Sequence, residues 1–385
     1  MTARLPGPGH SLRIFNPLKL SSTGFIMDVS TTAKGWKRSI RRNGGYHRGQ
    51  FTLVDDTPDH SKSAALANFF YQNLGTHFEE RAGGQVTWEG MIYEMDLAIG
   101  GVVRRVSLEK LYDHVMVKYT DENGKPKNGT PVYNQKSIDR YGRREEIIPL
   151  DGFPTASAEG AQATFLKENS WPWARGVGNN ITKEPTLTIR PCGYSFTANW
   201  RFSSITGGLT NLSDFIKAIV PADFEFLNLG SVDTNTFQVK QTQNIPQRCW
   251  DLILFLLELG DSTENIYRAY VDNNRRFNYK QIDPTFVEYY LRGGKFYNSA
   301  GGSQEVNYWQ FHPGVCRDMD SPISKSQYNP WFADGRDFYL DEVEFGDDME
   351  TPTWKTAYFE ESGILAAQAA YQRQLEQERA RKRKS

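Results

Sequence analysis

Short stretches in which apolar and polar residues alternate dominate the first hundred residues of the chain. A period of two is typical of strands with one buried face. It predicts strands at residues 11–15, 24–29, 50–54, 77–81, 85–97 and 102–107. Glycine pairs at 83–84 and 100–101 separate the last three, and because only glycine adopts positive φ freely, we expect tight hairpins there. A single helix is predicted at residues 63–74, with Gly75 at its end.

A second β-rich stretch follows. Residues 115–119 alternate, residues 121–129 form a polar loop tip, and small and apolar residues repeat at helical spacing over residues 156–169. Trp171-Pro172-Trp173 ends this helix, because proline cannot continue it. Further strands are predicted at residues 186–189 and 195–202.

The remaining third mixes both kinds of element. Residues 212–220 are helix-like, with Asn211 or Ser213 as the N-cap, and residues 249–259 form a second helix closed by Gly260. Strands rich in Tyr and Phe are expected beyond Arg268, little regular structure at residues 296–330, and a helix with a basic second half at residues 364–384. The pattern therefore predicts a β-rich α+β protein of two or three domains.

Composition narrows the function classes. Among 385 residues, 45 basic side chains face 46 acidic ones, and a net charge of −1 argues against a protein that coats nucleic acid. The longest apolar stretch, residues 252–257, is far shorter than the ~20 residues of a membrane span, so we expect a buried helix or strand there. Cys192, Cys249 and Cys316 lack metal-ligand spacing and predict free thiols, made in a reducing cytoplasm. The N-terminus has no signal-peptide pattern.

Signals for catalysis are weak. No nucleophile elbow, P-loop, zinc-protease motif or dinucleotide fingerprint is present, and the six histidines are isolated in sequence. The acidic run at residues 334–348 has carboxylates enough for calcium, but apolar residues alternate with them and favour a strand with one wet face. Glu89 and Glu94 could mimic a carboxylate pair, but residues an odd number apart on one strand point to opposite faces. No catalytic residue, cofactor or metal is predicted.

Two segments are densely basic, namely residues 37–42 and 379–384. Such runs are more often solvated faces or docking patches than sequence readers of nucleic acid. Either could also line a channel through which DNA passes, by unspecific attraction of phosphates.

Residues 137–145 read Ser-x-x-x-Tyr-Gly-x-Arg-Glu and are followed by an isoleucine-rich strand and an Ala-rich helix. This element resembles minor tail proteins and baseplate hub proteins of tailed bacteriophages. Residues 87–94, the helix at 161–169 with its following Trp-Pro, and residues 193–200 resemble further segments of that family. The likeness covers roughly residues 55–278.

The resemblance implies two barrel-like β domains with helical insertions, here followed by a C-terminal helix. It gives a first hub domain at 1–113, a second at 114–205, a mixed helix and strand region completing the hub at 206–360, and the basic helix at 361–385. Hubs of contractile tails are homotrimers in which two barrels per chain give pseudo-sixfold symmetry. The implied role is therefore a virion protein of the tail tip that forms a ring, joins the tail tube to the distal tip and surrounds the channel.

The implied partners are other copies of the chain, the tail tube or a distal tail protein, the tape-measure protein through the C-terminal helix, and DNA in transit. Within the Tyr-Gly-Arg element, Gly142 permits a turn and Tyr141 can pack its ring. Arg143, Arg144 and Glu145 could form charge pairs between subunits, or they could serve local structure alone.

Two other functions remain open. The aromatic and acidic region from 289 to 354 would suit a tail-associated enzyme that degrades cell wall or carbohydrate, with Asp334, Asp337 and Asp341 as candidate acids. The second of these open functions is a receptor-binding, lectin-like module.

Overall fold

The fold is described from a computed structural model. The residues that the structure describes are 10–16, 24–121, 123–150, 152, 154–181, 184–203, 208–220, 223–239, 247–261, 265–300, 305–306, 311–322, 332, 334–347 and 352–356. The predicted C-terminal helix and its basic run lie outside them.

Strands outnumber helices along these residues, which confirms the β-rich α+β class. The helices are α1 (Ser63–Gln72), α2 (Gln135–Tyr141), α3 (Thr155–Asn169), α4 (Ser195–Ala198), α5 (Leu212–Ile219) and α6 (Cys249–Glu258). The first strands are β1 (Ser11–Phe15), β2 (Phe25–Asp28), β3 (Ala33–Arg41), β4 (Gly44–Val54), β5 (His77–Ala82), β6 (Gln85–Ile99), β7 (Val102–Ser107), β8 (His114–Thr120), β9 (Pro126–Asn128), β10 (Val132–Tyr133), β11 (Glu145–Leu150) and β12 (Arg175–Asn179). The later strands are β13 (Thr186–Cys192), β14 (Thr210–Asn211), β15 (Asn228–Val232), β16 (Gln238–Val239), β17 (Tyr267–Val271), β18 (Arg276–Gln281), β19 (Tyr289–Arg292), β20 (Lys295–Asn298), β21 (Val315–Asp318), β22 (Asp337–Gly346) and β23 (Thr353–Thr356).

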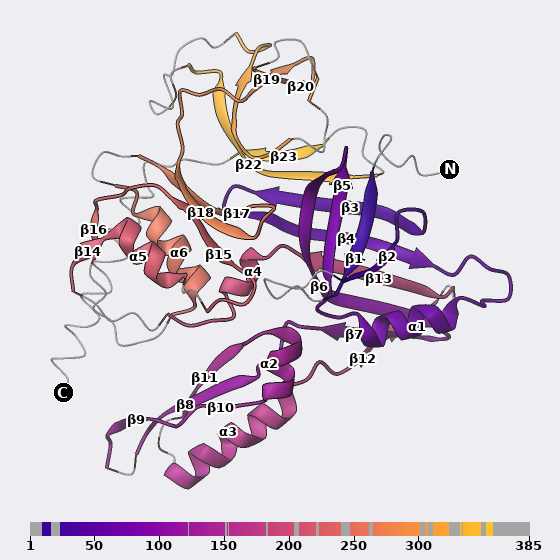
Figure 1. Ribbon diagram of the computed structural model, residues 1–385, viewed down its shortest axis with the longest axis vertical. Helices are drawn as coiled ribbons and strands as arrows, with labels where there is room; N and C mark the ends of the chain where they lie inside the picture. Colours follow the sequence, from indigo (N-terminus) through magenta and orange to yellow (C-terminus); the bar gives the residue numbers. More distant parts are fainter. Residues whose placement is uncertain are drawn as a thin grey trace.

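A curled sheet forms the centre of the molecule (Figure 1). Its strands pair in the order β2–β1–β5–β6–β13–β4–β3–β22, and every pairing is antiparallel. Aromatic rings from strands distant in this order meet inside the curl: Trp36 of β3 contacts Phe78 of β5 and Trp88 of β6 at centroid distances of 5.0 and 5.7 Å. The sheet therefore wraps around one apolar core.

The expected barrel does not close. No pairing between described residues joins the two ends of this order: β2 pairs with β1, and β22 pairs with β3, β21 and β23. Along its second half the long strand β6 stays paired with β13, but its other neighbour changes from β5 to β7, which in turn pairs with β12. The two-barrel prediction is thus wrong for this first sheet, which is open.

A second closed barrel is likewise not formed by the residues that the structure describes. Strands β8 to β11 form a small open sheet that lies apart from the centre, with α3 along one face (Figure 1). Val117, Tyr119 and Ala158 make its core, and the Gln162 amide donates to the carbonyls of Val115 and Thr130 at 2.7 and 2.8 Å. Because β11 runs parallel to β8, the chain needs a crossover, which α2 provides. Strands β8 to β11 and helix α3 therefore form a two-layer α/β unit.

Strand pairing crosses the boundary predicted after residue 113, because β12 and β13 return to pair with β7, β6 and β4. The domain boundaries themselves stay a prediction. One predicted strand is wrong: residues 195–202 begin with the short helix α4, because Thr197 bonds back to the Tyr194 carbonyl through both its N–H and its hydroxyl. Gly193 allows this turn, since a Cβ there would lie 1.8 Å from the Tyr46 carbonyl oxygen.

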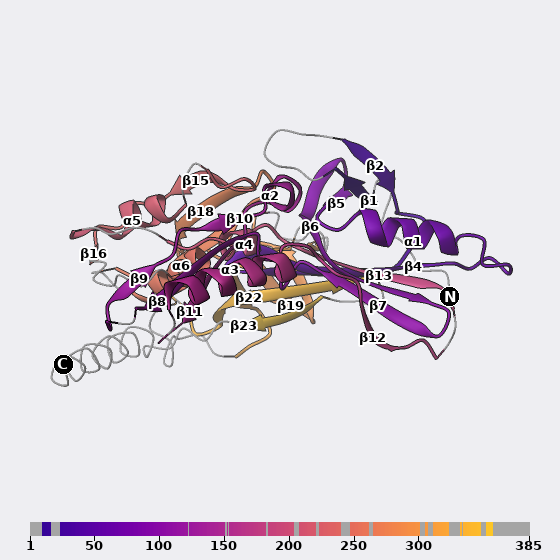
Figure 2. The same ribbon diagram turned by 90° about the horizontal axis from the view of Figure 1, so that it is seen from below.

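Two further groups of elements flank the sheet (Figures 1 and 2). Helices α5 and α6 bury their apolar faces beside β15, β17 and β18, where Tyr267 and Tyr279 stack at 4.8 Å. Strands β19 to β23 enclose a smaller core, whose β19 and β20 lie at the top of Figure 1, and β22 continues from it to pair with β3. The apolar run at 252–257 is thus part of the buried face of a helix. Among the described helices, none has the length and apolarity of a membrane span.

The three cysteines are free and buried, as predicted.

Candidate subunit-interface site around Tyr141

The Tyr-Gly-Arg element joins α2 to β11. Asn134 caps α2 by accepting from the Ser137 N–H, and Gly142 ends the helix with a φ of +82°. A Cβ on Gly142 would lie 2.3 Å from a ring carbon of Phe226. Glycine is therefore required here both for the backbone angle and for the close approach.

Tyr141 is buried within its own chain. Its ring packs edge-on against Trp171 with centroids 6.0 Å apart, and it also covers Gly75, where a Cβ would lie 3.0 Å from it. The Tyr141 ring therefore packs the end of α2 against the residues that follow α1. This agrees with the expectation that the ring packs.

Arg144 is also buried, and its guanidinium lies 4.0 Å from the ring centroid of Trp200. Its backbone N–H donates to Asp113 at 2.7 Å, and the Ser137 hydroxyl donates to the same carboxyl group at 3.2 Å. Burial raises the pKa of Asp113 to about 7. Arg144 and Asp113 therefore hold the start of β11 beside the start of β8.

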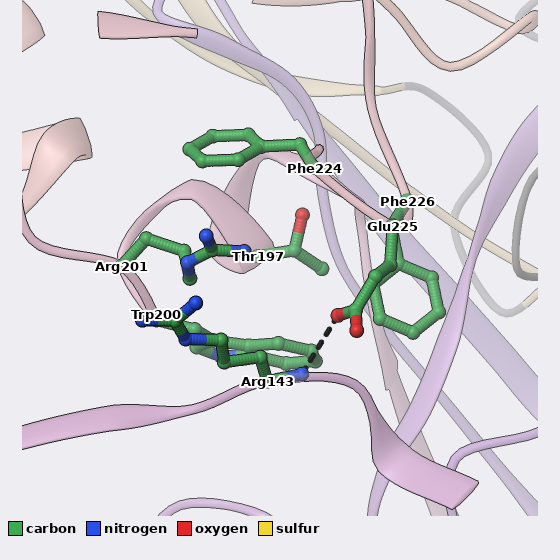
Figure 3. A pocket seen from close by; sticks show the side chains of 7 residues that line it. All are labelled: Arg143, Thr197, Trp200, Arg201, Phe224, Glu225 and Phe226. Carbon is green, nitrogen blue, oxygen red and sulfur yellow. Dashed lines mark hydrogen bonds between the residues drawn. The ribbon is translucent and has the colours of Figure 1, made fainter. Parts of the chain in front are cut away.

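Arg143 and Glu145 lie nearer the surface. Their side chains form an ion pair of 2.6 Å, and the Arg143 backbone N–H donates to Glu225 at 2.7 Å (Figure 3). Glu145 accepts from the Phe202 N–H at 2.8 Å and lies 3.4 Å from the Arg201 guanidinium. Acidic and basic side chains thus alternate around Arg143 and Glu145. Each of these two side chains has a partner within the chain.

A hollow of about 210 Å³, which includes space open to solvent, lies beside this pair (Figure 3). Its lining is Arg143, Thr197, Trp200, Arg201, Phe224, Glu225 and Phe226. The two arginines in it are matched by Glu145 and Asp223. The four residues predicted from the sequence thus divide into two buried ones, Tyr141 and Arg144, and two near the surface; their role between subunits stays a prediction.

The acidic run at 334–348 contains a strand, β22, as predicted. Its three candidate acids lie in separate ion pairs: Asp337 with Arg317 at 2.6 Å, Asp334 with Arg336 at 2.8 Å, and Asp341 with Arg42 at 3.1 Å. Each of the three carboxylates thus has its own arginine partner, and Asp337 alone among them is buried.

The prediction of opposite faces for Glu89 and Glu94 assumes a regular strand, but the β6–β13 ladder shifts its register between Ile92 and Glu94, so the alternation does not carry through. Glu94 pairs with Arg190 at 2.8 Å outside the core, whereas Glu89 is buried beside His77 and Glu79 of β5. The pattern predicted the β5–β6 hairpin but not that it brings these three side chains together. It also missed that Arg38, in the basic run, is a buried residue paired with Glu80.

Comparison with known proteins gives similarity in fold. No family model matches the sequence, and no curated protein matches it. The 43 kDa tail protein of prophage MuSo2 from Shewanella oneidensis superimposes with a TM-score of 0.42 at 8% identity, over 91% of this chain and 97% of that one. The E. coli c3393 protein, described as a type VI secretion component with structural similarity to the T4 tail proteins gp27 and gp5, gives 0.40 at 8% identity, over 84% and 72%.

The Francisella PdpA-VgrG complex gives a TM-score of 0.30 at 9% identity, over 88% of this chain and 48% of that one. The chain is therefore structurally similar to a prophage tail protein, to a type VI secretion component and to a chain of the PdpA-VgrG complex. Similarity at this level describes the path of the chain and not its activity.

Proposed function

We propose that this chain is a structural subunit of a bacteriophage tail tip, a baseplate hub or minor tail protein, that assembles into a ring. The resemblance of residues 137–145 to such proteins supports the class of function. The observation that carries the assembly role is an apolar strand edge, formed by β12 and the residues beside it.

All five residues of β12 are exposed, and β7 is its partner among the described residues. Apolar side chains gather along this edge: Trp173 is 62% exposed, Val177 49% and Ile181 90%, and Val102 of β7 is 39% exposed. Val102 lies opposite Asn179 in the β7–β12 ladder. Backbone N–H and C=O groups at such an edge can pair with a further strand.

Monomeric proteins protect their edge strands with lysine, proline, bulges or a covering element. The β12 sequence Arg-Gly-Val-Gly-Asn carries a single charge, at its first residue. One irregularity interrupts its ladder to β7, between Gly176 and Gly178, but β12 contains neither lysine nor proline. An apolar edge with so little protection is a liability in a monomer and can serve as an interface in an assembly. A ring of identical subunits removes such edges, because every copy supplies a surface to the next.

The assembled form is a homotrimer at the tip of the virion tail, placed between the tail tube or a distal tail protein and the tip. Its near-neutral charge leaves little repulsion between copies. DNA passes through its centre, and its action is assembly and not catalysis.

The test is the mass of the purified full chain by light scattering, alone and mixed with candidate tail proteins. The wild type is expected to form trimers or rings. The double variant Val177→Lys, Ile181→Lys should stay monomeric, because two ammonium groups at the edge oppose strand pairing. Its melting midpoint should match that of the wild type, since both side chains are exposed.

The matched control is Phe286→Lys, an exposed aromatic residue (62%) between β18 and β19. It should assemble like the wild type. A wild-type chain that remains monomeric with every tail protein would overturn the proposal. A double variant that still assembles would show that the β12 edge is not the subunit interface.

A further inference from the structure

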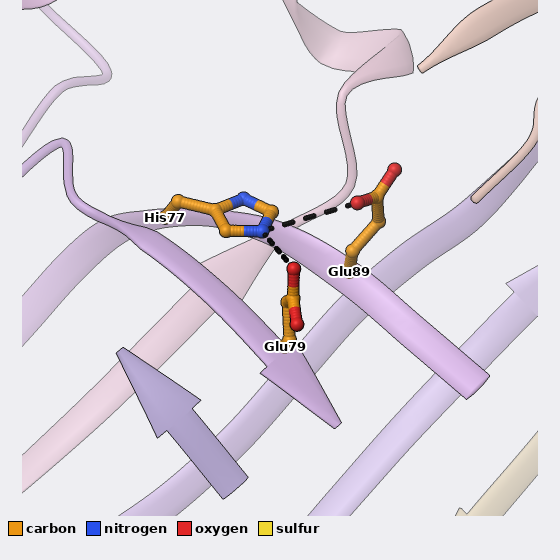
Figure 4. Close-up of side chains that lie close together, drawn as sticks. All are labelled: His77, Glu79 and Glu89. Carbon is orange, nitrogen blue, oxygen red and sulfur yellow. Dashed lines mark hydrogen bonds and ion pairs between the residues drawn. The ribbon is translucent and has the colours of Figure 1, made fainter. Parts of the chain in front are cut away.

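Three potential metal ligands converge between β5 and β6 (Figure 4). His77 and Glu79 are two residues apart on β5 and so share a face, and Glu89 of β6 lies directly opposite Glu79. His77 Nε2 is 3.0 Å from Glu79 Oε1 and 3.9 Å from Glu89 Oε2. One ligand atom from each residue lies within 4.8 Å of the other two.

All three side chains are buried, with residue exposures of 1%, 8% and 5% for His77, Glu79 and Glu89. In Figure 4 the two carboxyl groups approach the same ring nitrogen of His77. Glu89 Oε1 is a buried oxygen without a hydrogen-bond donor among the described residues. A buried carboxyl oxygen without a donor destabilises the fold unless a ligand or a proton satisfies it.

Neighbouring residues orient the first two ligands. The Tyr194 hydroxyl lies 2.6 Å from His77 Nδ1, and it can accept from an Nδ1–H, which leaves Nε2 free to bind a metal. Arg81 donates to Glu79 Oε2 at 2.6 Å, so Glu79 Oε1 stays available. Outer partners of this kind commonly fix the direction of metal ligands.

We propose that His77 Nε2, Glu79 and Glu89 bind one divalent transition-metal ion, with Zn²⁺ the best fit. Zinc bonds of ~2.0–2.1 Å to nitrogen and oxygen place tetrahedral ligand atoms roughly 3.3 Å apart, which lies between the two separations from His77 Nε2. A water molecule would complete the four ligands. Calcium needs six or more oxygen ligands, and magnesium a near-octahedral oxygen shell, so both fit less well.

Two carboxylates match the charge of a dication, and burial favours charges that are paired. The Arg81 guanidinium, 2.6 Å from Glu79 Oε2, adds one positive charge at the edge of the site. The ion would tie β5 to β6 inside the curled sheet, independently of the ring proposed above.

The test uses the full chain, unfolded and refolded with and without excess Zn²⁺, because the ligands are too buried for rapid entry. After removal of free metal, mass spectrometry should find one Zn²⁺ per chain, and the melting midpoint should exceed that of the metal-free chain. X-ray absorption should show nitrogen and oxygen neighbours and no sulfur. Refolding with Co²⁺ should give the visible absorption of a four-coordinate site.

Glu89→Gln should weaken Zn²⁺ binding by about tenfold or more, and it should still fold, since glutamine resembles the protonated acid. Asp113→Asn is the matched control, because it removes another buried carboxyl group outside this cluster, and it should bind one Zn²⁺. Substoichiometric zinc in the refolded wild type, sulfur neighbours, or undiminished binding by Glu89→Gln would each overturn the proposal.

Discussion

Arg38 and Glu80 form a salt bridge across the inside of the curled sheet, with Arg38 Nε 2.8 Å from Glu80 Oε2 and both side chains 1% exposed. β3 and β5 are not neighbours in the sheet, so this contact spans the curl. Glu80 also accepts from the Trp36 indole at 3.0 Å and from the Thr87 hydroxyl at 3.1 Å, and lies 2.8 Å from His10 Nε2. These contacts supply the hydrogen bonds that a buried carboxylate requires.

Replacing Glu80 by Gln should therefore lower the free energy of unfolding by about 3–5 kcal/mol, because the Arg38 charge stays buried without its counterion. Urea unfolding followed by tryptophan fluorescence measures the change, since Trp36 contacts the same carboxylate. Glu305→Gln is the control, because its pair with Lys295 is about half exposed on both sides. It should shift the midpoint little. Equal shifts for both variants would contradict a special role for the buried pair.

Gly142 and Gly100 both have positive φ, at +82° and +64°, but they differ in surroundings. A Cβ at Gly100 meets nothing within 4 Å, whereas one at Gly142 would overlap Phe226. Gly100→Ala should cost roughly 1 kcal/mol of stability from backbone strain. Gly142→Ala should cost about 1–3 kcal/mol more, because the core must shift. Thermal unfolding of both variants measures the two losses of stability. A smaller loss for Gly142→Ala than for Gly100→Ala would contradict the close packing of Gly142 against Phe226.

Arg143 and Arg144 are adjacent but should behave differently on truncation. Arg144→Ala removes a buried guanidinium from the face of Trp200 and should destabilise the isolated subunit by about 2 kcal/mol or more. Arg143→Ala breaks a pair near the surface and should change subunit stability by less than about 1 kcal/mol. If Arg143 lies between subunits, its loss should weaken the trimer. Melting curves and light scattering on both variants separate these effects; equal losses of stability would count against the distinction.

His47 gives the fold a sensitivity to acid. Burial, and then the charges of Arg41 and Arg48, lower its pKa to about 4 from an ordinary 6.5. Between these values the unfolded chain binds a proton that the folded chain does not, so stability is lost as pH falls from about 6.5 to about 4. The loss amounts to at most about 3 kcal/mol.

His47→Gln should flatten this part of the pH profile. The comparison is the urea midpoint of wild type and variant at several pH values between 4 and 8. Above pH 7 the histidine is neutral in both states, so the difference between the two proteins should be constant there. A wild-type slope that survives in the variant would assign the acid sensitivity to other groups.

The sequence by itself determined most of the elements. β1, β5 and β7 and the helices α1, α3, α5 and α6 lie where hydrophobic periodicity predicted them, within a few residues. This succeeds because periodicity and glycine stops are local properties of the chain. The strand in the acidic run followed from the same rule.

Tertiary structure decided how these elements meet. The basic run on β3 and the acidic run on β22 lie side by side, so that Arg41 pairs with Glu342, although 301 residues separate them in sequence. Local pattern carries no information on such pairing, and for this reason the runs looked like solvated faces. Whether each sheet closes or stays open also depends on which strand occupies each of its edges.

The cluster at His77 shows that local pattern also fails to determine the pairing within a single hairpin. In the β5–β6 hairpin Arg81 lies opposite Val86, and regular pairing would then place Glu79 opposite Trp88, with Glu89 on the other face of the sheet. A bulge between Glu80 and Arg81 shifts the register by one residue and brings Glu89 opposite Glu79 instead. The sequence determined the hairpin and its residues, but the packing of the core around Trp88 decided the register and, with it, which side chains share a site.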